Sequence, residues 1–189
     1  MTFNPDIHHR KSIRLRGYDY SQAGVYFVTI CTHDRTPSFG EIINGEMKMN
    51  EAGVIATDEI LVTAKMRHNV SFDEFIVMPN HMHGIITVGA RCTRPECTRA
   101  ECMSQNGDGN ESGRVESGRV QRAPTVGDVV RGYKSAVTKR INQLRNLPFA
   151  PVWQRNYYEH IIRDEAAYLK IAEYIQTNPQ RWQEDTYYV

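Results

Sequence analysis

The pattern of hydrophobic and polar positions predicts four core strands and one additional hairpin. The first strand is expected at residues 24–32, where β-branched and aromatic residues follow one another. Further strands are expected at residues 72–78, 83–88 and 153–162. Two short apolar runs flank Asn44-Gly45, and this dipeptide predicts a small hairpin because both positions of a type I′ turn need positive φ.

Three other segments have the period of a helix with one buried face. Residues 51–67 follow Asn50, which is a suitable N-cap. Residues 126–145 form an amphipathic pattern, with apolar residues on one helical face and cations on the other. A last helix is expected at residues 165–178, ending before Pro179. Without the hairpin, the order of elements predicts an α+β fold: a ferredoxin-like antiparallel sheet of βαββαβ order with helices packed on it.

Residues 90–124 differ in composition from the rest of the chain. They contain Cys-Thr-Arg-Pro-Glu followed by Cys-Thr-Arg-Ala-Glu, and then Glu-Ser-Gly-Arg-Val twice. Such repeats bury too little apolar surface to offset the entropy lost on ordering. We therefore expect a single domain over residues 1–189 with a disordered insertion at about 90–124. Cys92, Cys97 and Cys102 lie in this segment without the fourth ligand of a zinc site.

Composition disfavours some classes of protein, whereas net charge does not. The chain is 40% hydrophobic, which is enough for a core, but no apolar run approaches the roughly 18 residues of a membrane span. The polar, basic start does not favour a secretory signal, and the cysteine pattern favours free thiols, so we expect a cytoplasmic protein without a membrane partner. The net charge of +1 does not decide whether nucleic acid is bound.

The distribution of charge is more informative than the net value. Cations cluster at two places, near the N-terminus and on the predicted helix 126–145. The members of the two clusters are Arg10, Lys11, Arg14 and Arg16, and Arg131, Lys134, Lys139, Arg140 and Arg145. A phosphate backbone requires such clusters, but a solvated protein face has them too, so charge alone leaves both interpretations open.

His81 and His83 are the first candidates for chemistry. Alternate side chains of a strand share a face, so both imidazoles point the same way at the beginning of a strand and could bind one divalent ion. A lone His-x-His pair is also common on ordinary surfaces. The compact segment Met-Pro-Asn-His-Met-His-Gly, at the beginning of a strand, favours the metal site.

Tyr174 and Asn178 are the second pair of candidates, because residues four apart share one helical face. Asn178 could offer its carbonyl oxygen to a cation, and Tyr174 could attack a phosphate held beside it. Lys170, one turn earlier, could stabilise the phosphoryl oxygens. A helical tyrosine usually packs, and Tyr168 is the competing tyrosine, but four residues after it comes Ala172, which cannot bind a metal.

Four motifs occur in the order expected of one family of proteins. They are Gly-Tyr-Asp-Tyr-Ser-Gln-Ala-Gly-Val-Tyr-Phe-Val-Thr-Ile-Cys-Thr, Met-Pro-Asn-His-Met-His-Gly, Val-Trp-Gln-Arg-Asn-Tyr-Tyr-Glu-His-Ile-Ile-Arg and Tyr-Ile-Gln-Thr-Asn-Pro. Together they resemble the single-tyrosine transposases of the HUH (histidine–hydrophobic–histidine) class. The most similar branch is that of the REP-associated tyrosine transposases, which act on repeated extragenic palindromes in bacterial chromosomes. The resemblance covers nearly everything except the insertion.

The resemblance implies a reaction and a set of roles. The reaction is metal-dependent cleavage and strand transfer of single-stranded DNA through a 5′-phosphotyrosine intermediate. His81 and His83 match the metal-binding pair, Tyr174 on a C-terminal catalytic helix matches the nucleophile, and Asn178 matches the polar residue that completes the metal shell. Mg²⁺ or Mn²⁺ is the expected cofactor, because a nitrogen and oxygen ligand set with open positions must admit the phosphate.

The expected partner is single-stranded or hairpin DNA in the bacterial cytoplasm and nucleoid. The cation clusters and Lys170 are candidates for phosphate contacts, and Tyr18, Tyr20 and Trp153 are candidates for stacking on unpaired bases. The sequence leaves open whether the protein is a monomer or a homodimer. A hairpin-DNA-binding protein that no longer cuts is an alternative. A small metal-binding protein unrelated to DNA would explain the histidines but not the tyrosine motif.

Overall fold

The structure is a computed structural model, and it describes residues 18, 20, 22–67, 69–89 and 124–188. The predicted N-terminal cations Arg10, Lys11, Arg14 and Arg16 lie outside the described residues. So do the repeats of the predicted disordered insertion. Among the described residues, no helix combines the length and the hydrophobicity needed to cross a membrane.

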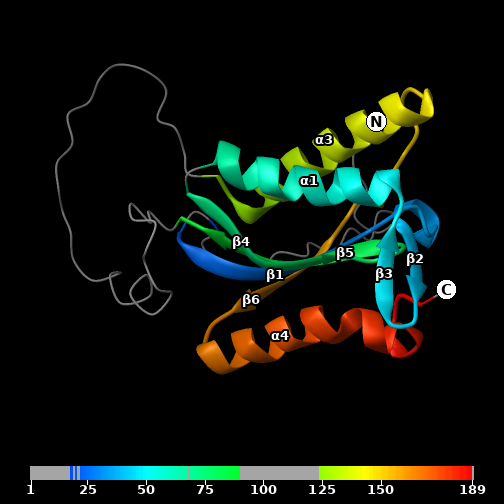
Figure 1. The fold of residues 1–189 in the computed structure, drawn as a ribbon. Helices are drawn as coiled ribbons and strands as arrows, with labels where there is room; N and C mark the ends of the chain where they lie inside the picture. The colour runs from blue at the N-terminus through cyan, green and yellow to red at the C-terminus, as the bar shows by residue number, and fades with distance from the viewer. Residues whose placement is uncertain (1–17, 19, 21, 68, 90–123, 189) are drawn as a thin grey trace, which may run out of the picture.

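Four antiparallel strands form the central sheet, in the order β4-β5-β1-β6 (Figure 1). Their bounds are Gly24–Cys31 for β1, Val70–Val77 for β4, His81–Val88 for β5 and Tyr158–Ile162 for β6. One helix lies between β1 and β4 in the sequence and another between β5 and β6, which gives the βαββαβ order of a ferredoxin-like fold. The predicted fold class is therefore confirmed.

Helices cover both faces of this sheet. The helices α1 and α3 lie on one face and α4 lies on the other, as Figure 1 shows. Their bounds are Glu51–Met66 for α1, Val126–Arg145 for α3 and Glu165–Thr177 for α4, and two 3-10 segments are η1 (His33–Arg35) and η2 (Asn178–Glu184). The sheet thus has a two-helix layer on one side and a single helix on the other.

Side-chain caps explain where the helices begin. The Asn50 side chain accepts a hydrogen bond from the backbone N–H of Gly53, which satisfies one of the free donors at the start of α1. Thr125 and Asp128 form a reciprocal capping box at the start of α3. Asp164 caps α4 in the same manner as Asn50 caps α1. These caps fix the helix boundaries independently of the packing of the helices.

The predicted hairpin is confirmed, turn included. It consists of β2 (Gly40–Ile43) and β3 (Glu46–Met49), joined by Asn44 at φ 53° and Gly45 at φ 76°. Positive φ at both positions is the requirement of a type I′ turn. Figure 1 shows the hairpin beyond one end of the central sheet.

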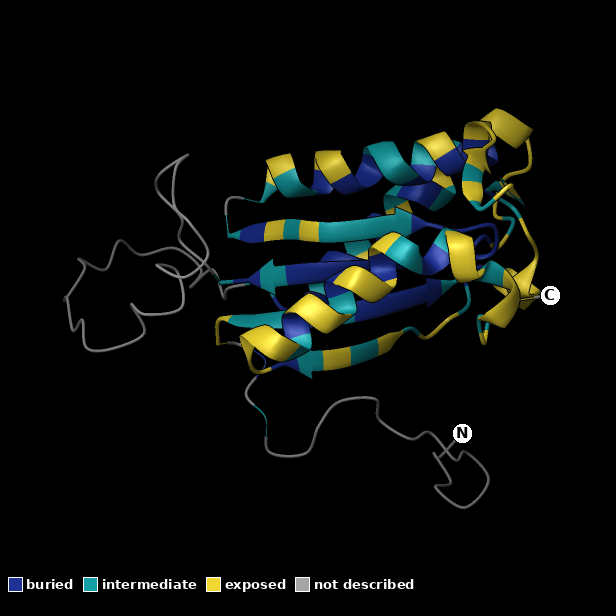
Figure 2. Ribbon diagram, turned by 60° about the horizontal axis from the view of Figure 1, so that its bottom comes forward, coloured by how far each residue is buried: buried dark blue, intermediate teal, exposed yellow. Residues whose placement is uncertain are grey.

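The hydrophobic core is divided into two parts by the sheet. Met82 and Ile86 of β5 belong to the larger core beneath α1 and α3, whereas Ile85 belongs to the smaller core beneath α4. Figure 2, with α4 turned forward, shows the two central strands buried and the edge strands partly exposed. Because alternate residues share a face, His81 and His83 lie on the α4 side with Ile85.

Two predicted boundaries are wrong. The strand expected at 153–162 is only β6, an edge strand that pairs with β1 alone, because Trp153 turns into the larger core and forms just an isolated bridge with Thr32. The last helix ends at Thr177, but the chain continues as η2 through Pro179. Proline can occupy the first turn of a helix, where its missing N–H would have no partner.

Gly53 and Gly132 offer a matched pair of helix substitutions. A Cβ at Gly53 would lie 2.2 Å from the backbone oxygen of Phe39, whereas a Cβ at Gly132 would meet only the flexible end of Arg67. Alanine in a helix is favoured over glycine by about 1 kcal/mol, but a backbone clash costs about 1–3 kcal/mol.

We therefore expect Gly53→Ala to lower the free energy of unfolding by about 1–2 kcal/mol. Gly132→Ala is expected to leave it unchanged or to raise it by up to about 1 kcal/mol. Urea denaturation of both variants measures the difference. Equal effects of the two substitutions would contradict the close approach of α1 to the backbone of Phe39.

Candidate active site

His81 and His83 lie side by side at the beginning of β5, opposite Cys31 and Thr29 of β1. Both side chains are buried, with exposed fractions of 0% and 1%. Their Nε2 atoms are 2.9 Å apart. Two imidazole nitrogens that bind one ion at a right angle, with bonds of about 2.1 Å, are about 3.0 Å apart, so the pair has the spacing of two metal ligands.

Hydrogen bonds to the other ring nitrogens hold both imidazoles in place. His81 Nδ1 is 2.9 Å from Asn80 Oδ1, and Asn80 Nδ2 donates to the carbonyl of Tyr187 at 2.7 Å. His83 Nδ1 is 2.8 Å from Thr29 Oγ1. Since Asn80 Oδ1 can only accept, His81 Nδ1 carries the proton and the Nε2 of the neutral ring carries a lone pair. This is the usual arrangement around histidines that bind metals.

Burial keeps both rings uncharged. Removal from water lowers the pKa of His81 to about 4, because a charged imidazolium would lose its hydration. Burial, together with the neighbouring His81, lowers the pKa of His83 well below its usual range. At neutral pH both imidazoles are therefore in the form that binds metal ions.

Asp185 is the third ligand-bearing residue at this place, and no sequence motif indicated it. Its carboxylate and the two imidazoles offer ligand atoms that all lie within 4.8 Å of one another, so the group could hold a metal ion. Asp185 follows η2, which brings the chain back to the histidines after α4. The sequence held one weak signal: Glu184 and Asp185 are the only acidic residues after Glu173.

Tyr174 lies next to this group. Its hydroxyl is 3.2 Å from His83 Nε2 and donates to Asp185 Oδ2 at 3.2 Å. Burial and the negative charge of Asp185 raise the pKa of Tyr174 above its usual value, so the phenol is protonated at neutral pH. The competing tyrosine, Tyr168, is buried in the smaller core and is a packing residue.

Asn178 completes the set of residues predicted to meet at the site. Its Nδ2 donates to Asp185 Oδ2 at 2.5 Å. Its Oδ1 is buried and has no hydrogen-bond partner among the described residues. A buried carbonyl oxygen without a partner is uncommon, and a cation beside it would satisfy it. The structure therefore brings His81, His83, Tyr174 and Asn178 together, and it adds Asp185.

Aromatic rings surround these polar groups. Phe27 stacks on His83 with ring centroids 5.4 Å apart, and Tyr187 lies against His81 at 4.7 Å. Trp182 contacts His81 from η2, at 5.8 Å. The rings exclude water from one side of the site, which strengthens the electrostatic interactions within it.

Several of the predicted phosphate-binding cations already have partners. Arg131 forms an ion pair with Asp128, and Arg140 bonds to Asp58 and Glu59 of α1. These carboxylates neutralise the two guanidinium groups, so Arg131 and Arg140 would contribute less to phosphate binding than unpaired cations. Their assignment as DNA contacts stays a prediction.

The predicted lysine contacts differ in their hydrogen bonds and in their exposure to solvent. Lys134 Nζ donates to the carbonyls of Gln154 and Arg155, at 2.6 Å and 3.1 Å. Lys139 on α3 is exposed, as is Lys170 on α4, one turn before Tyr174. Lys139 and Lys170 therefore stay as predicted phosphate contacts with free access to solvent.

For two of the three residues predicted to stack on unpaired bases, the prediction is wrong. Tyr20 and Trp153 are buried in the larger core, so their ring faces cannot meet a base. Tyr18 is partly buried and packs edge-on against Tyr20, with centroids 4.9 Å apart. His160, a histidine of β6, is exposed and takes no part in the site.

The fold and the site define a class of protein. The structure of a REP-associated tyrosine transposase bound to a REP hairpin aligns with 91% of this chain and 74% of that chain, at a TM-score of 0.51 and 18% sequence identity. Identity this low shows the fold alone, and the fold is that of the REP-associated tyrosine transposases. The resemblance seen in the sequence motifs is thus confirmed at the level of the fold.

A curated relative shows the family. A protein of Haemophilus influenzae, described as uncharacterized, is 41% identical over 191 residues, which cover 99% of this chain and 97% of the relative. The chain belongs to the family of this Haemophilus protein. No family model matches the chain.

Metal affinity tests the histidine pair. We expect His81→Ala to weaken Mn²⁺ binding by about 100-fold or more, since loss of partners outside the ligand shell alone costs about 10–100-fold. Isothermal titration measures the affinity, and electron paramagnetic resonance of free Mn²⁺ checks it. His160→Ala, the loss of an exposed histidine, is the control and should bind as the unchanged protein does. Mn²⁺ affinity that survives His81→Ala would exclude this site.

Proposed function

We propose that the chain is a metal-dependent enzyme that cleaves and rejoins single-stranded DNA, with Tyr174 as its nucleophile. One observation carries the proposal: the Tyr174 hydroxyl lies within 3.2 Å of both His83 Nε2 and Asp185 Oδ2, beside a set of metal-ligating atoms. The transposase with the same fold was solved with a REP hairpin, which supports hairpin DNA as the substrate.

His81, His83 and Asp185 would hold the divalent cation, with Asn178 Oδ1 as a further oxygen ligand. Two imidazole nitrogens and two oxygens from Asp185 and Asn178 suit Mn²⁺ and admit Mg²⁺. A bound cation would withdraw charge from the phosphoryl oxygens and so make the phosphorus easier to attack. The aromatic rings of Phe27 and Tyr187 would keep water from the opposite side.

The covalent step follows from the position of Tyr174. Its phenolic oxygen attacks the phosphorus of a phosphodiester, and the O–P bond forms as the bond from phosphorus to the 3′ oxygen breaks. The phenolic proton passes to Asp185, which already accepts its hydrogen bond. The 3′ oxygen leaves as an alkoxide and takes a proton from solvent water, which yields a free 3′ hydroxyl. The 5′ phosphate stays on Tyr174, so the bond energy is kept for rejoining.

All of these residues come from a single chain. The proposal therefore needs no second subunit to complete the site, and of the two oligomeric states left open by the sequence, the monomer is sufficient. Lys170, one turn before Tyr174 and exposed, would meet the DNA backbone next to the attacked phosphate. Lys139 and the other cations of α3 lie on the opposite face of the sheet from α4.

A second function is favoured by one specific observation. The hydrogen bond to Asp185 and the raised pKa of Tyr174 hold the phenol in its protonated, weakly nucleophilic form. A protein with this constraint could bind hairpin DNA without cutting it. Tight binding of hairpin DNA without any covalent adduct, with either Mg²⁺ or Mn²⁺ present, would favour this alternative.

The covalent adduct tests the nucleophile. We expect the unchanged protein with Mn²⁺ to shift a 3′-labelled single-stranded hairpin oligonucleotide to the mass of a protein–DNA adduct on a denaturing gel. A 5′-labelled strand should instead yield a shorter free fragment with a 3′ hydroxyl. Tyr174→Phe should reduce both products to background, because it removes only the attacking oxygen.

The matched control is Tyr158→Phe. Tyr158 is an exposed tyrosine whose ring also contacts Phe27, with centroids 6.2 Å apart, as the ring of Tyr174 does. This variant should form the adduct at an unchanged rate. An adduct that persists in Tyr174→Phe and disappears in Tyr158→Phe would move the nucleophile to β6.

Asp185, which the sequence did not indicate, has its own test. We expect Asp185→Asn to weaken Mn²⁺ binding by about 10–100-fold and to slow adduct formation, because it removes both the anionic ligand and the proton acceptor while keeping the shape. Glu184→Gln, a change at the neighbouring exposed carboxylate, should alter neither quantity. Unchanged affinity and rate in Asp185→Asn would leave Asn178 as the only oxygen ligand.

A further inference from the structure

Tyr187 follows η2 in the chain and contacts both histidines and the carboxylate of the candidate metal site. The centroid of its ring lies 4.7 Å from that of His81 and 5.8 Å from that of His83. Its backbone N–H donates to Asp185 Oδ1 at 2.7 Å. A single residue, which is not itself among the proposed ligands, therefore contacts three side chains that are.

The backbone carbonyl of Tyr187 is linked to His81 through one side chain. Asn80 Nδ2 donates to this carbonyl at 2.7 Å, and Asn80 Oδ1 is 2.9 Å from His81 Nδ1. Asn80 is 1% exposed, so water does not compete readily for either hydrogen bond. The donor and acceptor ends of an amide are fixed, and the Tyr187 carbonyl can only accept. This carbonyl therefore decides which end of Asn80 faces His81.

The orientation of Asn80 has a direct consequence for metal binding. With Oδ1 toward the ring, His81 carries its proton on Nδ1 and a lone pair on Nε2. With the amide turned over, Nδ2 would donate to His81 Nδ1, and the ring proton would move to Nε2, where the cation has to bind. The Tyr187 carbonyl thus selects the tautomer of His81 that can serve as a ligand.

The phenol of Tyr187 is linked to His83 in a similar manner. The Thr29 side chain forms a hydrogen bond to the Tyr187 hydroxyl, and Thr29 Oγ1 is 2.8 Å from His83 Nδ1. Burial raises the pKa of Tyr187 by more than this hydrogen bond lowers it, so the phenol keeps its proton at neutral pH. Hydroxyl groups can donate or accept, so the link orients the ring of His83 in either tautomer.

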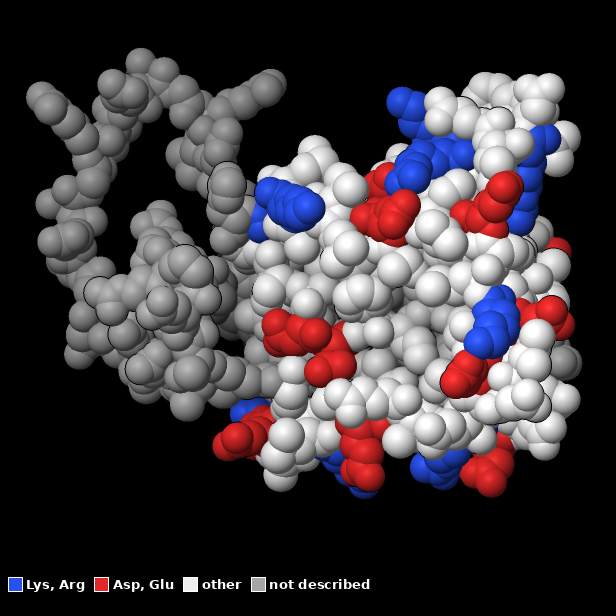
Figure 3. Space-filling model, viewed as in Figure 1, with Lys and Arg blue, Asp and Glu red and all other residues white. Residues whose placement is uncertain are grey.

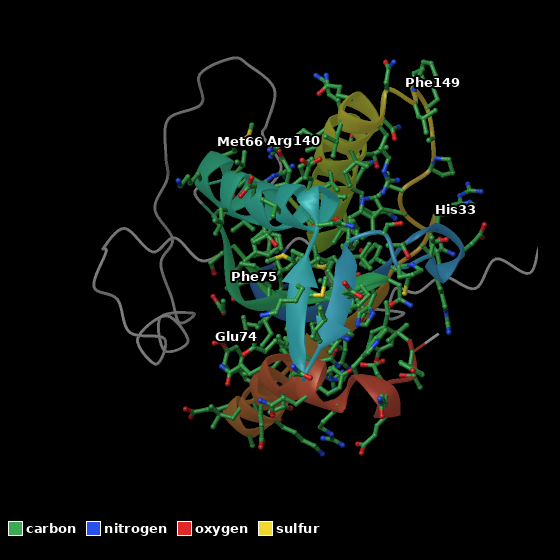
Figure 4. The ribbon with its side chains drawn as sticks, turned by 45° about the vertical axis from the view of Figure 1, so that its right-hand side comes forward. His33, Met66, Glu74, Phe75, Arg140 and Phe149 are labelled. Atoms are coloured by element: carbon green, nitrogen blue, oxygen red, sulfur yellow. The ribbon has the colours of Figure 1, made fainter. Side chains whose placement is uncertain are left out.

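Arg35 of η1 holds the segment that carries Tyr187. Its guanidinium carbon lies 5.5 Å from the centroid of the Tyr187 ring, a cation–π distance, and Nη1 donates to the carbonyl of Thr186 at 3.4 Å. Asp34 and Arg35 both have positive φ, 54° and 56°, which is costly for residues other than glycine. Figure 4 shows η1, marked by its His33, at the same end of the molecule as the C-terminal segment. The strained turn therefore serves to direct Arg35 to residues 186 and 187.

General electrostatic attraction does not explain why this segment docks. Figure 3 shows acidic and basic side chains intermixed at the hairpin end of the molecule, so neither sign of charge dominates there. Lys48 pairs with Glu46 in the hairpin, and Arg181 pairs with Glu184 in η2. Exposed pairs of this kind contribute little to stability. The specific contacts of Tyr187 therefore carry the docking.

We propose that Tyr187 is a positioning residue of the metal site, which holds Asp185, His81 and His83 in the orientation that a divalent cation requires. The proposal rests on the proposed function, because it takes these three residues as metal ligands. It adds that the ligand set is complete only when residues 185–187 are docked against β1 and β5. Tyr187 acts through the ligands and not on the DNA.

Mn²⁺ affinity measures the effect of Tyr187 on the site. We expect Tyr187→Ala to weaken Mn²⁺ binding by about 10-fold, as the loss of a partner outside the ligand shell does. Tyr187→Phe keeps the ring and the backbone contacts and loses only the link to Thr29, so it should weaken binding by roughly 3-fold. The midpoint of urea unfolding checks that both variants are folded.

Tyr188→Ala is the matched control. Tyr188 is the next residue in the chain and is also a tyrosine, but it is 50% exposed and its ring contacts Trp182, with centroids 5.4 Å apart. This variant should bind Mn²⁺ as the unchanged protein does. Equal affinities of Tyr187→Ala and Tyr188→Ala would overturn the proposal.

The tautomer of His81 is a property that a purely structural role of Tyr187 would leave unchanged. In the metal-free protein, the ¹⁵N chemical shifts of the imidazole should show the proton of His81 on Nδ1. Tyr187→Ala should release the segment and with it Asn80, so both tautomers should appear, whereas Tyr188→Ala should keep the single one. A single Nδ1 tautomer in Tyr187→Ala, with lowered urea stability as the only effect, would make Tyr187 a packing residue and reject the proposal.

The positioning role and the proposed function can fail separately. Weaker Mn²⁺ binding and mixed His81 tautomers in Tyr187→Ala would support the positioning role even if the unchanged protein forms no covalent adduct with DNA. Unchanged Mn²⁺ affinity in Tyr187→Ala, together with a normal adduct, would leave the catalytic proposal standing and reject the role of Tyr187.

Discussion

The pairing of β1 with β5 is the constraint on which the rest of the structure depends. In this register His83 lies opposite Thr29 and His81 lies opposite Cys31. Because side chains alternate along a strand, a slip of one residue would turn both imidazoles into the larger core and Met82 out of it. The hydrogen bond between His83 Nδ1 and Thr29 Oγ1 exists only in the observed register. Hydrophobic burial on one face thus fixes the polar geometry on the other.

The β1–β5 pairing places two uncharged imidazoles side by side in a buried position, and the C-terminal segment supplies the charged group next to them. Two neutral imidazoles with their Nε2 atoms 2.9 Å apart can share one hydrogen bond at most, and burial prevents either ring from taking up a proton easily. The chain brings Asp185 to them through α4 and η2, together with the phenol of Tyr174. The carboxylate supplies the negative charge that a cation between the rings would need. The arrangement could therefore hold a metal ion, as the proposed function requires.

Much of the fold and of the candidate site could be predicted from the sequence. The two exceptions, Asp185 and Trp153, have a common cause. The alternation along β5 and the spacing of Tyr174 and Asn178 are local patterns, so the histidine pair and the face of α4 that carries Tyr174 were predictable. Asp185 was not, because its position depends on how η2 turns after Pro179. Trp153 was included in the strand predicted at 153–162, but burial against Phe39 and Tyr133 removes it from the ladder. Tertiary packing decided both cases.

A short series of contacts joins Trp153 to the candidate active site. Trp153 bridges to Thr32, whose hydroxyl donates to the carbonyl of Asn80 at 2.9 Å, and the Asn80 side chain orients His81. A shift of Trp153 would therefore pass through three consecutive contacts to a proposed metal ligand. Short, well-packed contacts of this kind transmit displacement better than a flexible loop does. The end of the sheet where β1 finishes and β5 begins thus carries both the proposed metal ligands and the contacts that hold them in place.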